Sequence, residues 1–310
     1  MSITVVGSIA YDTVTTPFGR RERMLGGAAT HFALAASLFD EVHVVGSVGG
    51  DFRAEDRAIL GTRGSHLDDV DVIPDGKTFA WAGEYGWDLN RRETLDTQLN
   101  VFERFAPRLG PAARACDVLF LANIQPSLQL SVLGQCDRPR WVAVDSMDLW
   151  IDVARPDLLR VIERVDCVVL NDAEVRQLTG HPTTVGGARE LLDWGPTAVV
   201  AKQGEYGAIL VTGEGTFSLP SYPLEVVVDP TGAGDTFAGG LVGHLAANAG
   251  RPIDHELLST AIAYGTATAS FNVEEFGTER VSRLTLDEVQ ARVDDLHRMT
   301  QFRQPEPFTP

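Results

Sequence analysis

Apolar residues follow two alternating patterns along this chain. Short runs of adjacent apolar residues, many of them β-branched, are separated by longer stretches in which apolar residues recur every three or four positions. Continuous runs are typical of central parallel strands, which are covered on both faces, and the wider spacing is typical of amphipathic helices. The predicted strands are Ile3–Val6, Val42–Val45, Val118–Leu121, Trp141–Val144, Val165–Leu170, Ala198–Lys202 and Ala208–Val211.

The helical stretches fall mainly between these strands. They are Ala28–Phe39, Ala54–Gly61, Leu128–Leu133, Asp157–Arg164, Ala173–Leu178 and Gly187–Trp194. Repeated strand–helix–strand units predict an α/β fold with an open, mostly parallel sheet and right-handed crossovers.

The stretch from Gly76 to Phe105 breaks the alternation. Its first part, Thr78–Tyr85, has aromatic residues at every second position, which predicts an antiparallel strand with one apolar face. The polar residues that follow have no helical stripe. We interpret the stretch as a small sheet or lid inserted into the α/β body, with a long surface loop as the alternative.

The last third of the chain is predicted to be helical. Thr285 and Glu288 have the spacing of a capping box, which predicts a final helix from there to about Met299. The tail from Gln301 contains three prolines and is expected to fray.

Charge and composition narrow the function classes. The chain has 310 residues, 44% of them hydrophobic, and a net charge of −17. An acidic protein is a poor general binder of nucleic acid or of anionic membranes, because both draw on Lys and Arg. No apolar run approaches the roughly 18 residues of a membrane span, the N-terminus lacks a secretory signal, and the three cysteines have no metal-site spacing. We therefore expect a soluble cytoplasmic protein with free thiols.

One segment carries the chemistry. Val226–Val228 predicts a strand that ends at Asp229, and a helix with Phe237, Leu241 and Leu245 on one face begins a few residues later. The small residues between them, Gly232-Ala233-Gly234, lie where the first backbone N–H groups of a helix have no partner. Because the helix dipole adds positive potential there, the turn is predicted to bind an anion such as phosphate.

Asp235 lies within this turn, although a carboxylate repels phosphate. It either caps the helix or acts as a general base that takes a proton from a hydroxyl attacking a terminal phosphate. The second interpretation explains more, because it gives the carboxylate a reason to lie beside the anion.

The run Asp229-Pro230-Thr231-Gly232-Ala233-Gly234-Asp235 closely resembles the signature of the ribokinase-like (PfkB) family of carbohydrate and nucleoside kinases. The resemblance implies a single three-layer α/β/α domain over residues 1–310, with a mostly parallel sheet and a β lid from about 11–24 and 77–105. It implies ATP-dependent transfer of the γ-phosphoryl group to a small neutral sugar, with a nucleoside as the alternative acceptor. Asp235 would be the base and Gly232, Ala233 and Gly234 the anion hole.

On the acceptor side, the resemblance assigns hydroxyl binding to the Asp of the opening Gly7-Ser8-Ile9-Ala10-Tyr11-Asp12. The turn Gly26-Gly27 is similar to the family's substrate-binding turn, which extends here to His31. The family usually has Asn at this last position.

On the nucleotide side, Asn171 and Glu174 match the family's Asn-x-x-Glu element, and Glu174 would help to place Mg²⁺ through water. The resemblance assigns further nucleotide contacts to Lys202, Gly204, Gly207 and Thr231. Asp229 would contribute to a monovalent-cation site for K⁺.

Two departures from the family's Asp-x-Asn-x-Arg element bear on the substrate. Met147 and Leu149 replace its Asn and Arg, which favours a neutral substrate, although Arg91 or Arg92 of the lid has the length to reach in. The competing functions are a catalytically inactive sugar or nucleotide sensor and a dinucleotide oxidoreductase, but the latter's G-x-G-x-x-G fingerprint does not follow the first strand. In relatives the lid often forms a dimer interface, so a homodimer is expected.

Overall fold

The computed structural model describes residues 2–301, and a mostly parallel sheet forms its centre. The strands lie in the order β14-β13-β12-β11-β10-β9-β1-β4-β5, with β6 paired to β4. Only the pairs β12–β13 and β13–β14 are antiparallel among these. The strands are β1 Ser2–Val6, β4 Glu41–Gly49, β5 Ser65–His66, β6 Val70–Ile73, β9 Val118–Leu121, β10 Trp141–Asp145, β11 Cys167–Asn171, β12 Ala198–Lys202, β13 Ala208–Thr212 and β14 Thr216–Leu219.

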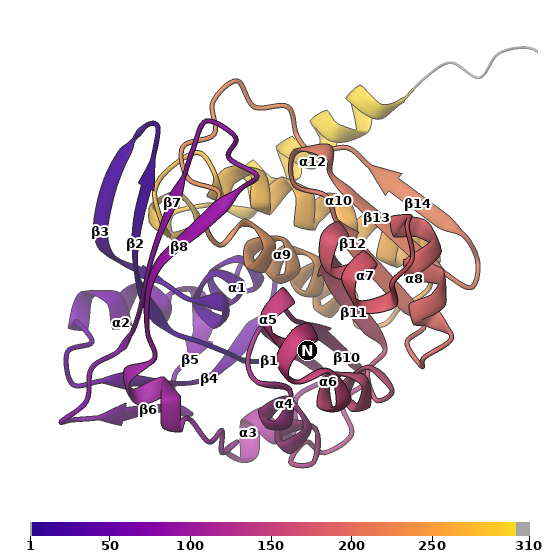
Figure 1. Ribbon diagram of the computed structural model, residues 1–310. Helices are drawn as coiled ribbons and strands as arrows, with labels where there is room; N and C mark the ends of the chain where they lie inside the picture. Colours follow the sequence, from indigo (N-terminus) through magenta and orange to yellow (C-terminus); the bar gives the residue numbers. More distant parts are fainter. Residues whose placement is uncertain (1, 302–310) are drawn as a thin grey trace, which may run out of the picture.

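Helices cover both faces of this sheet and bury two hydrophobic clusters against it (Figure 1). One cluster packs under α1, α9, α10 and α12, and the other under α3 to α8. The three-layer α/β/α prediction is therefore confirmed. The helices are α1 Ala28–Ala36, α2 Ala54–Leu60, α3 Pro111–Arg114, α4 Pro126–Leu133, α5 Asp148–Val153, α6 Arg155–Ile162, α7 Asp172–Thr179, α8 Thr184–Leu192, α9 Ala233–Ala247, α10 His255–Asn272, α11 Glu279–Ser282 and α12 Leu286–Thr300.

A second, four-stranded sheet in the order β3-β2-β7-β8 projects from the body at the upper left of Figure 1. Its strands are β2 Ala10–Thr16, β3 Gly19–Gly26, β7 Phe79–Tyr85 and β8 Arg92–Gln98. The small inserted sheet is thus present. Strand β7 pairs antiparallel with β8, as its pattern predicts, but parallel with β2 on its other side. Every residue of β8 is exposed, which explains why this strand has no apolar signature.

The strand predicted at Val226–Val228 is wrong. Residues 221–230 form an irregular segment, in which the backbone N–H of Val228 donates to the carbonyl of Val273 at 2.8 Å. Pro220, Pro223 and Pro230 frame this segment, and proline cannot donate to a ladder. The segment that leads to Asp229 is therefore hydrogen-bonded to the end of α10 and not to the sheet.

Arg63 joins distant parts of the chain. It has a left-handed backbone (φ +52°), and its guanidinium donates to the carbonyls of Leu34 (2.6 Å), Val281 (3.1 Å) and Ser282 (2.9 Å). A fourth bond reaches the carbonyl of Leu284 at 3.3 Å. The end of α1 is thus tied to α11 and to the segment that follows it.

The chain's final helix begins as predicted. The capping box of Thr285 and Glu288 is present at the start of α12. The tail predicted from Gln301 onward lies outside the described residues after that first position. Within residues 2–301, no helix is both long and apolar enough to cross a membrane.

Candidate active site

The site lies at the carboxyl ends of three neighbouring parallel strands. Asp145 ends β10, Asn171 ends β11 and Lys202 ends β12, and Asn171 is directly opposite Lys202 in the register of their two strands. Open α/β sheets bind ligands at this edge. The anion turn faces this edge, since the amine of Lys202 lies 3.1 Å from where a Cβ on Gly234 would stand.

At the turn before α9, the N–H of Ala233 donates to the carbonyl of Pro230 at 3.2 Å, and the N–H groups of Gly232 and Gly234 stay available to a ligand. Gly232 is the N-cap residue with φ +75°, and no side chain caps the helix. The turn is held from behind, because Thr231 donates its N–H to Asp229 Oδ1 (2.9 Å) and accepts at its carbonyl from Asn272 Nδ2 (2.8 Å). This rigid turn at the start of a 15-residue helix is suited to a phosphate.

His31 lies behind this turn. Its side chain is buried at 1% exposure, and a Cβ built on Gly232 would come within 2.4 Å of three atoms of its ring. Its Nδ1 lies 3.1 Å from Asn272 Oδ1, the atom that also accepts from Thr236 Oγ1 at 3.0 Å. Burial lowers the pKa of His31 to about 4, so the ring is neutral. This position favours support of the turn over the substrate contact that the sequence suggested.

Lys202 brings a positive charge to the anion turn. Its Nζ lies 2.8 Å from Asp145 Oδ2, and both side chains are largely buried. Burial opposes the charge of the amine, but Asp145 and Glu174 raise the pKa of Lys202, so it stays protonated. Asp145 was not among the predicted site residues, although its place at the end of a parallel strand was a usable signal.

Asp235 lies in the first turn of α9. Burial, and then the negative charge of Asp145, raise its pKa to about 7, while Lys202 acts in the opposite direction. A carboxyl with this pKa exchanges a proton near neutral pH, as a general base requires. The structure thus gives Asp235 an environment that helix capping alone does not need.

Glu174 forms a capping box with Asn171 at the start of α7, and its Oε2 accepts from the Asn171 N–H at 2.8 Å. Burial and then Asp145 raise its pKa to about 7. No group of three metal-ligating side chains gathers in residues 2–301. Mg²⁺ commonly needs only one or two carboxylates besides water and phosphate. The carboxyl of Glu174, which is buried and lies near the negative charge of Asp145, therefore fits such an ion.

Asp12, which the resemblance predicts to bind the acceptor hydroxyls, lies on β2. Burial and then the charge of Asp229 raise the pKa of Asp12 to about 7. A Cβ on Gly26 would lie 2.0 Å from Asp12 Oδ2, and one on Gly27 (φ +95°) would lie 2.5 Å from the carbonyl of Ser8. Both positions of the Gly26-Gly27 turn need glycine, because the chain passes too close to Asp12 and to β2 for a side chain.

Side chains of the second sheet lie beside Asp12. Trp81 is its register partner on β7, and the Trp81 ring covers Gly83. The Arg92 guanidinium lies 5.3 Å from the Trp81 ring and lowers the pKa of both Asp12 and Asp235 as one of several influences. Tyr85 reaches the anion turn through a 3.4 Å bond between its hydroxyl and Thr231 Oγ1. Arg92 was predicted as a residue that could reach the site, but Tyr85 was not.

A cavity of about 700 Å³ adjoins the anion turn. Lys202, Gly204 and Gly234 lie in its lining, with Gly207 beside them. The rest of the lining is more apolar and includes Tyr222, Leu224, Phe237, Ala269 and Val273. A polar end beside an apolar chamber suits a nucleotide. Of the predicted nucleotide contacts, Asn171, Glu174 and Thr231 lie outside this lining.

Asp229 is fully buried, and burial raises its pKa. Its Oδ1 accepts from Thr231, and its Oδ2 accepts from the N–H of Gly277 at 2.9 Å. The carboxylate therefore joins the anion turn to the segment after α10. The monovalent-cation role stays a prediction.

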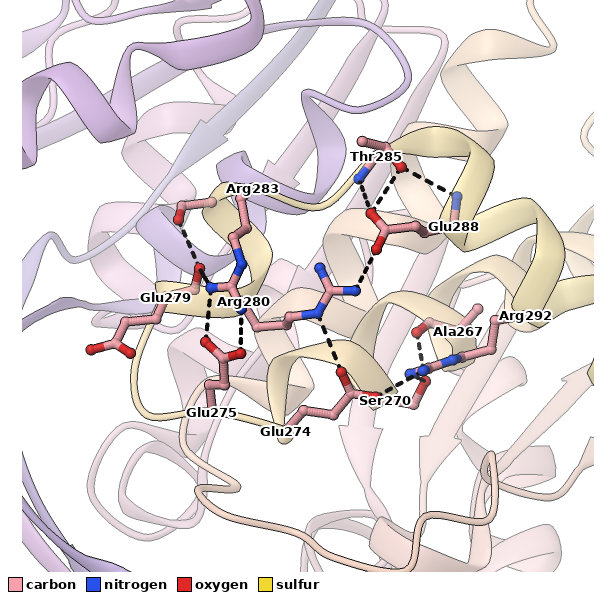
Figure 2. Close-up of polar contacts among 11 residues, drawn as sticks. Ala267, Ser270, Glu274, Glu275, Glu279, Arg280, Arg283, Thr285, Glu288 and Arg292 are labelled. Atoms are coloured by element: carbon pink, nitrogen blue, oxygen red, sulfur yellow. Dashed lines mark hydrogen bonds and ion pairs between the residues drawn. The ribbon is translucent and has the colours of Figure 1, made fainter.

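Figure 2 shows a cluster of arginines and glutamates around the end of α10, the helix that contributes Ser270 to the cavity lining. Arg280 and Arg292 converge on Glu274, at 3.3 and 2.8 Å. Arg292 also donates to Ser270 Oγ at 3.0 Å, and its guanidinium lies 3.4 Å from the centre of the Phe271 ring. Because Ser270 and Val273 line the cavity, the cluster fixes that wall from behind.

Replacing Arg292 with Met should destabilise this wall. We expect a loss of about 1–3 kcal/mol in the free energy of unfolding, because the change removes hydrogen bonds to a largely buried charge. Chemical denaturation measures it. Arg283→Met is the matched control, since Arg283 pairs with Glu275 on the exposed side of the same cluster and should change stability little (Figure 2). Equal losses of unfolding free energy in the two variants would contradict the role of Arg292 in supporting this wall.

The model of the pfkB family of carbohydrate kinases matches residues 140–284. The chain is 33% identical to the cytidine kinase of Thermococcus kodakarensis, over 82% of this chain and 91% of that protein. The structure of Burkholderia thailandensis nucleoside kinase with inosine has a TM-score of 0.76 at 22% identity, covering 94% of this chain and 97% of that one. A putative ribokinase II from E. coli in complex with ATP and Mg²⁺ has a TM-score of 0.78 at 19% identity, covering 95% and 99%.

Proposed function

Because this chain belongs to the pfkB family of carbohydrate kinases and is therefore a phosphotransferase with a hydroxyl acceptor, we propose that it transfers the γ-phosphoryl group of ATP to a hydroxyl of a nucleoside. The observation that carries the choice of acceptor is the similarity to a cytidine kinase over most of both chains. The free sugar favoured by the sequence alone becomes the second candidate.

The acceptor binds against the second sheet, beside Asp12 on β2 and Trp81 on β7. Asp12 accepts hydrogen bonds from the ribose hydroxyls, and the Trp81 ring offers its face to the base, since aromatic side chains stack well on bases. A free sugar would use Asp12 in the same way but has no base to stack on the Trp81 ring. Met147 and Leu149 bring no charge to the site, which suits a neutral acceptor.

The reaction is an in-line transfer at the anion turn. Asp235 takes the proton of the attacking hydroxyl, and the first N–H groups of α9 stabilise the charge of the transferred group. Lys202 leaves Asp145 in part to contact the phosphates. Bound Mg²⁺ would neutralise phosphate charge, with Glu174 holding its waters. ATP and Mg²⁺ are proposed here because a structural neighbour binds both.

The pH profile tests the two acidic groups. Because burial raises the pKa of Asp12 and of Asp235 to about 7, both are partly protonated at neutral pH. Only the ionised carboxylates bind the diol and take the proton, so kcat/KM should rise from about pH 5.5 to about pH 8. Circular dichroism at each pH serves as the control for folding. A flat pH profile would contradict the roles of Asp12 and Asp235.

A phosphorylation screen tests the acceptor class. The protein is incubated with Mg-ATP and a panel of pyrimidine nucleosides, purine nucleosides, pentoses and ketoses, and ADP release is measured. We expect the highest kcat/KM with a nucleoside. Faster turnover of a free sugar would overturn the acceptor class but not the kinase. Ligand binding without ADP formation by any acceptor would favour the inactive sensor.

A further inference from the structure

The tip of the hairpin β7–β8 borders the nucleotide cavity. Residues 87–90 of this tip share the cavity lining with Lys202, Gly204 and Gly234. The same hairpin carries Trp81 and Tyr85 on the acceptor side. One element of the second sheet thus reaches both halves of the site, although the cavity is otherwise lined by the α/β body.

A specific contact holds the tip at the cavity. Asn90 Nδ2 donates to Glu205 Oε1 at 2.9 Å. Gly204 has φ +57°, and a Cβ at this position would lie 2.7 Å from Asn90 Oδ1. The glycine therefore lets the tip approach the turn that follows β12, where the lining of the cavity begins.

The exposure of Trp87 at the tip is not explained by packing within the described part of the chain. Its side chain is 85% exposed, and its described aromatic contact is an edge-on approach to Phe18 at 6.5 Å. A large apolar ring left open beside a cavity of about 700 Å³ is the kind of surface that a ligand covers. The phosphates of a nucleotide would go to Lys202 and the anion turn. The flat, uncharged indole suits the base and ribose instead.

We propose that Trp87 is a nucleotide-binding residue, whose indole packs against the nucleoside portion of ATP and closes the cavity from the side of the second sheet. This inference rests on the proposed function, because it takes the cavity ligand to be the phosphoryl donor. Asn90 acts as a positioning residue that keeps the tip at the cavity.

The test measures binding of two probes, ATP and inorganic tripolyphosphate, to the full chain by calorimetry. For Trp87→Ala we expect ATP to bind roughly 5- to 150-fold more weakly, the range found when a base loses an aromatic partner. Tripolyphosphate, which has no base or ribose, should bind as it does to the unchanged protein. Leu95→Ala is the matched control, since Leu95 is an exposed apolar residue of the same hairpin outside the cavity lining.

The outcomes separate this inference from the proposed function. If the unchanged protein phosphorylates nucleosides but Trp87→Ala binds ATP with unchanged affinity, only the inference is overturned. Equal weakening of ATP and tripolyphosphate would also overturn it, since the indole would then act on the phosphates or on folding. A protein that binds ATP but phosphorylates no acceptor would overturn the function, and the Trp87→Ala comparison would still decide the inference.

Discussion

Asp235→Asn should lower kcat by about 10²- to 10⁴-fold, the usual contribution of a positioned general base. The amide keeps the shape of the side chain but cannot take a proton from the attacking hydroxyl. Affinity for ATP should stay the same or increase, because the change removes a negative charge from the anion turn. Steady-state kinetics and calorimetric titration with ATP measure the two quantities.

A control separates this role from helix capping. Asp287 lies in the first turn of α12, a helix of the same 15-residue length, but on the exposed surface. If Asp235 only stabilised its helix, Asp235→Asn and Asp287→Asn would have similar small effects on stability. Both would then retain most of the kcat of the unchanged protein, and the assignment of Asp235 as base would fail.

Gly232→Ala should have the second-largest effect. The residue has φ +75°, and its new methyl group would overlap the His31 ring, whose atoms lie from 2.3 Å away. The turn must shift, and its N–H groups then miss the transferred phosphoryl group. Loss of one such donor typically costs about 10²–10³ in kcat, so we expect a decrease of that size.

Gly180→Ala is the matched control for Gly232→Ala. Gly180 ends α7 with φ +74°, and a Cβ built there meets no atom within 4 Å. Gly180→Ala therefore measures only the cost of a left-handed backbone at a residue with a side chain. We expect it to lower the free energy of unfolding by about 1–2 kcal/mol and to leave kcat unchanged. Adding His31→Ala to Gly232→Ala should recover part of kcat, since it removes the overlapping ring. No recovery would mean that the overlap with His31 is not the cause.

The parts of the fold that depend on local pattern could be predicted from the sequence. The parallel strands and their helices follow from apolar runs, and the anion turn follows from small residues before an amphipathic helix. Val226–Val228 were wrongly predicted as a strand, because β-branched residues favour one only where a partner strand is available. Here the N–H of Val228 pairs with Val273 instead.

The parts of the site that depend on contacts across the chain could not be predicted. Asp145 gains its role from Lys202, 57 positions away. Tyr85 gains its role from Thr231, 146 positions away. The resemblance assigned His31 to the substrate together with the turn Gly26-Gly27, and this contact stays a prediction. The sequence did not indicate that, one helical turn after Gly27, the His31 ring lies against the anion turn. Every residue of β8 is exposed, so its sequence has no alternation of apolar and polar residues from which a strand could be predicted.

The hydrogen bonds of Arg63 affect when the N-terminal part of the chain can fold during synthesis. Its guanidinium is satisfied by carbonyls up to Leu284, and α1 packs on α9, which ends at Ala247. During synthesis, α1 therefore lacks its partner helix α9, and Arg63 lacks the carbonyls of Val281 to Leu284, until most of the chain has left the ribosome. At roughly 5–20 residues per second, the exposed apolar face of α1 has to be protected for tens of seconds. We expect this domain to fold late and as one unit, with its N-terminal third the part that most needs a chaperone.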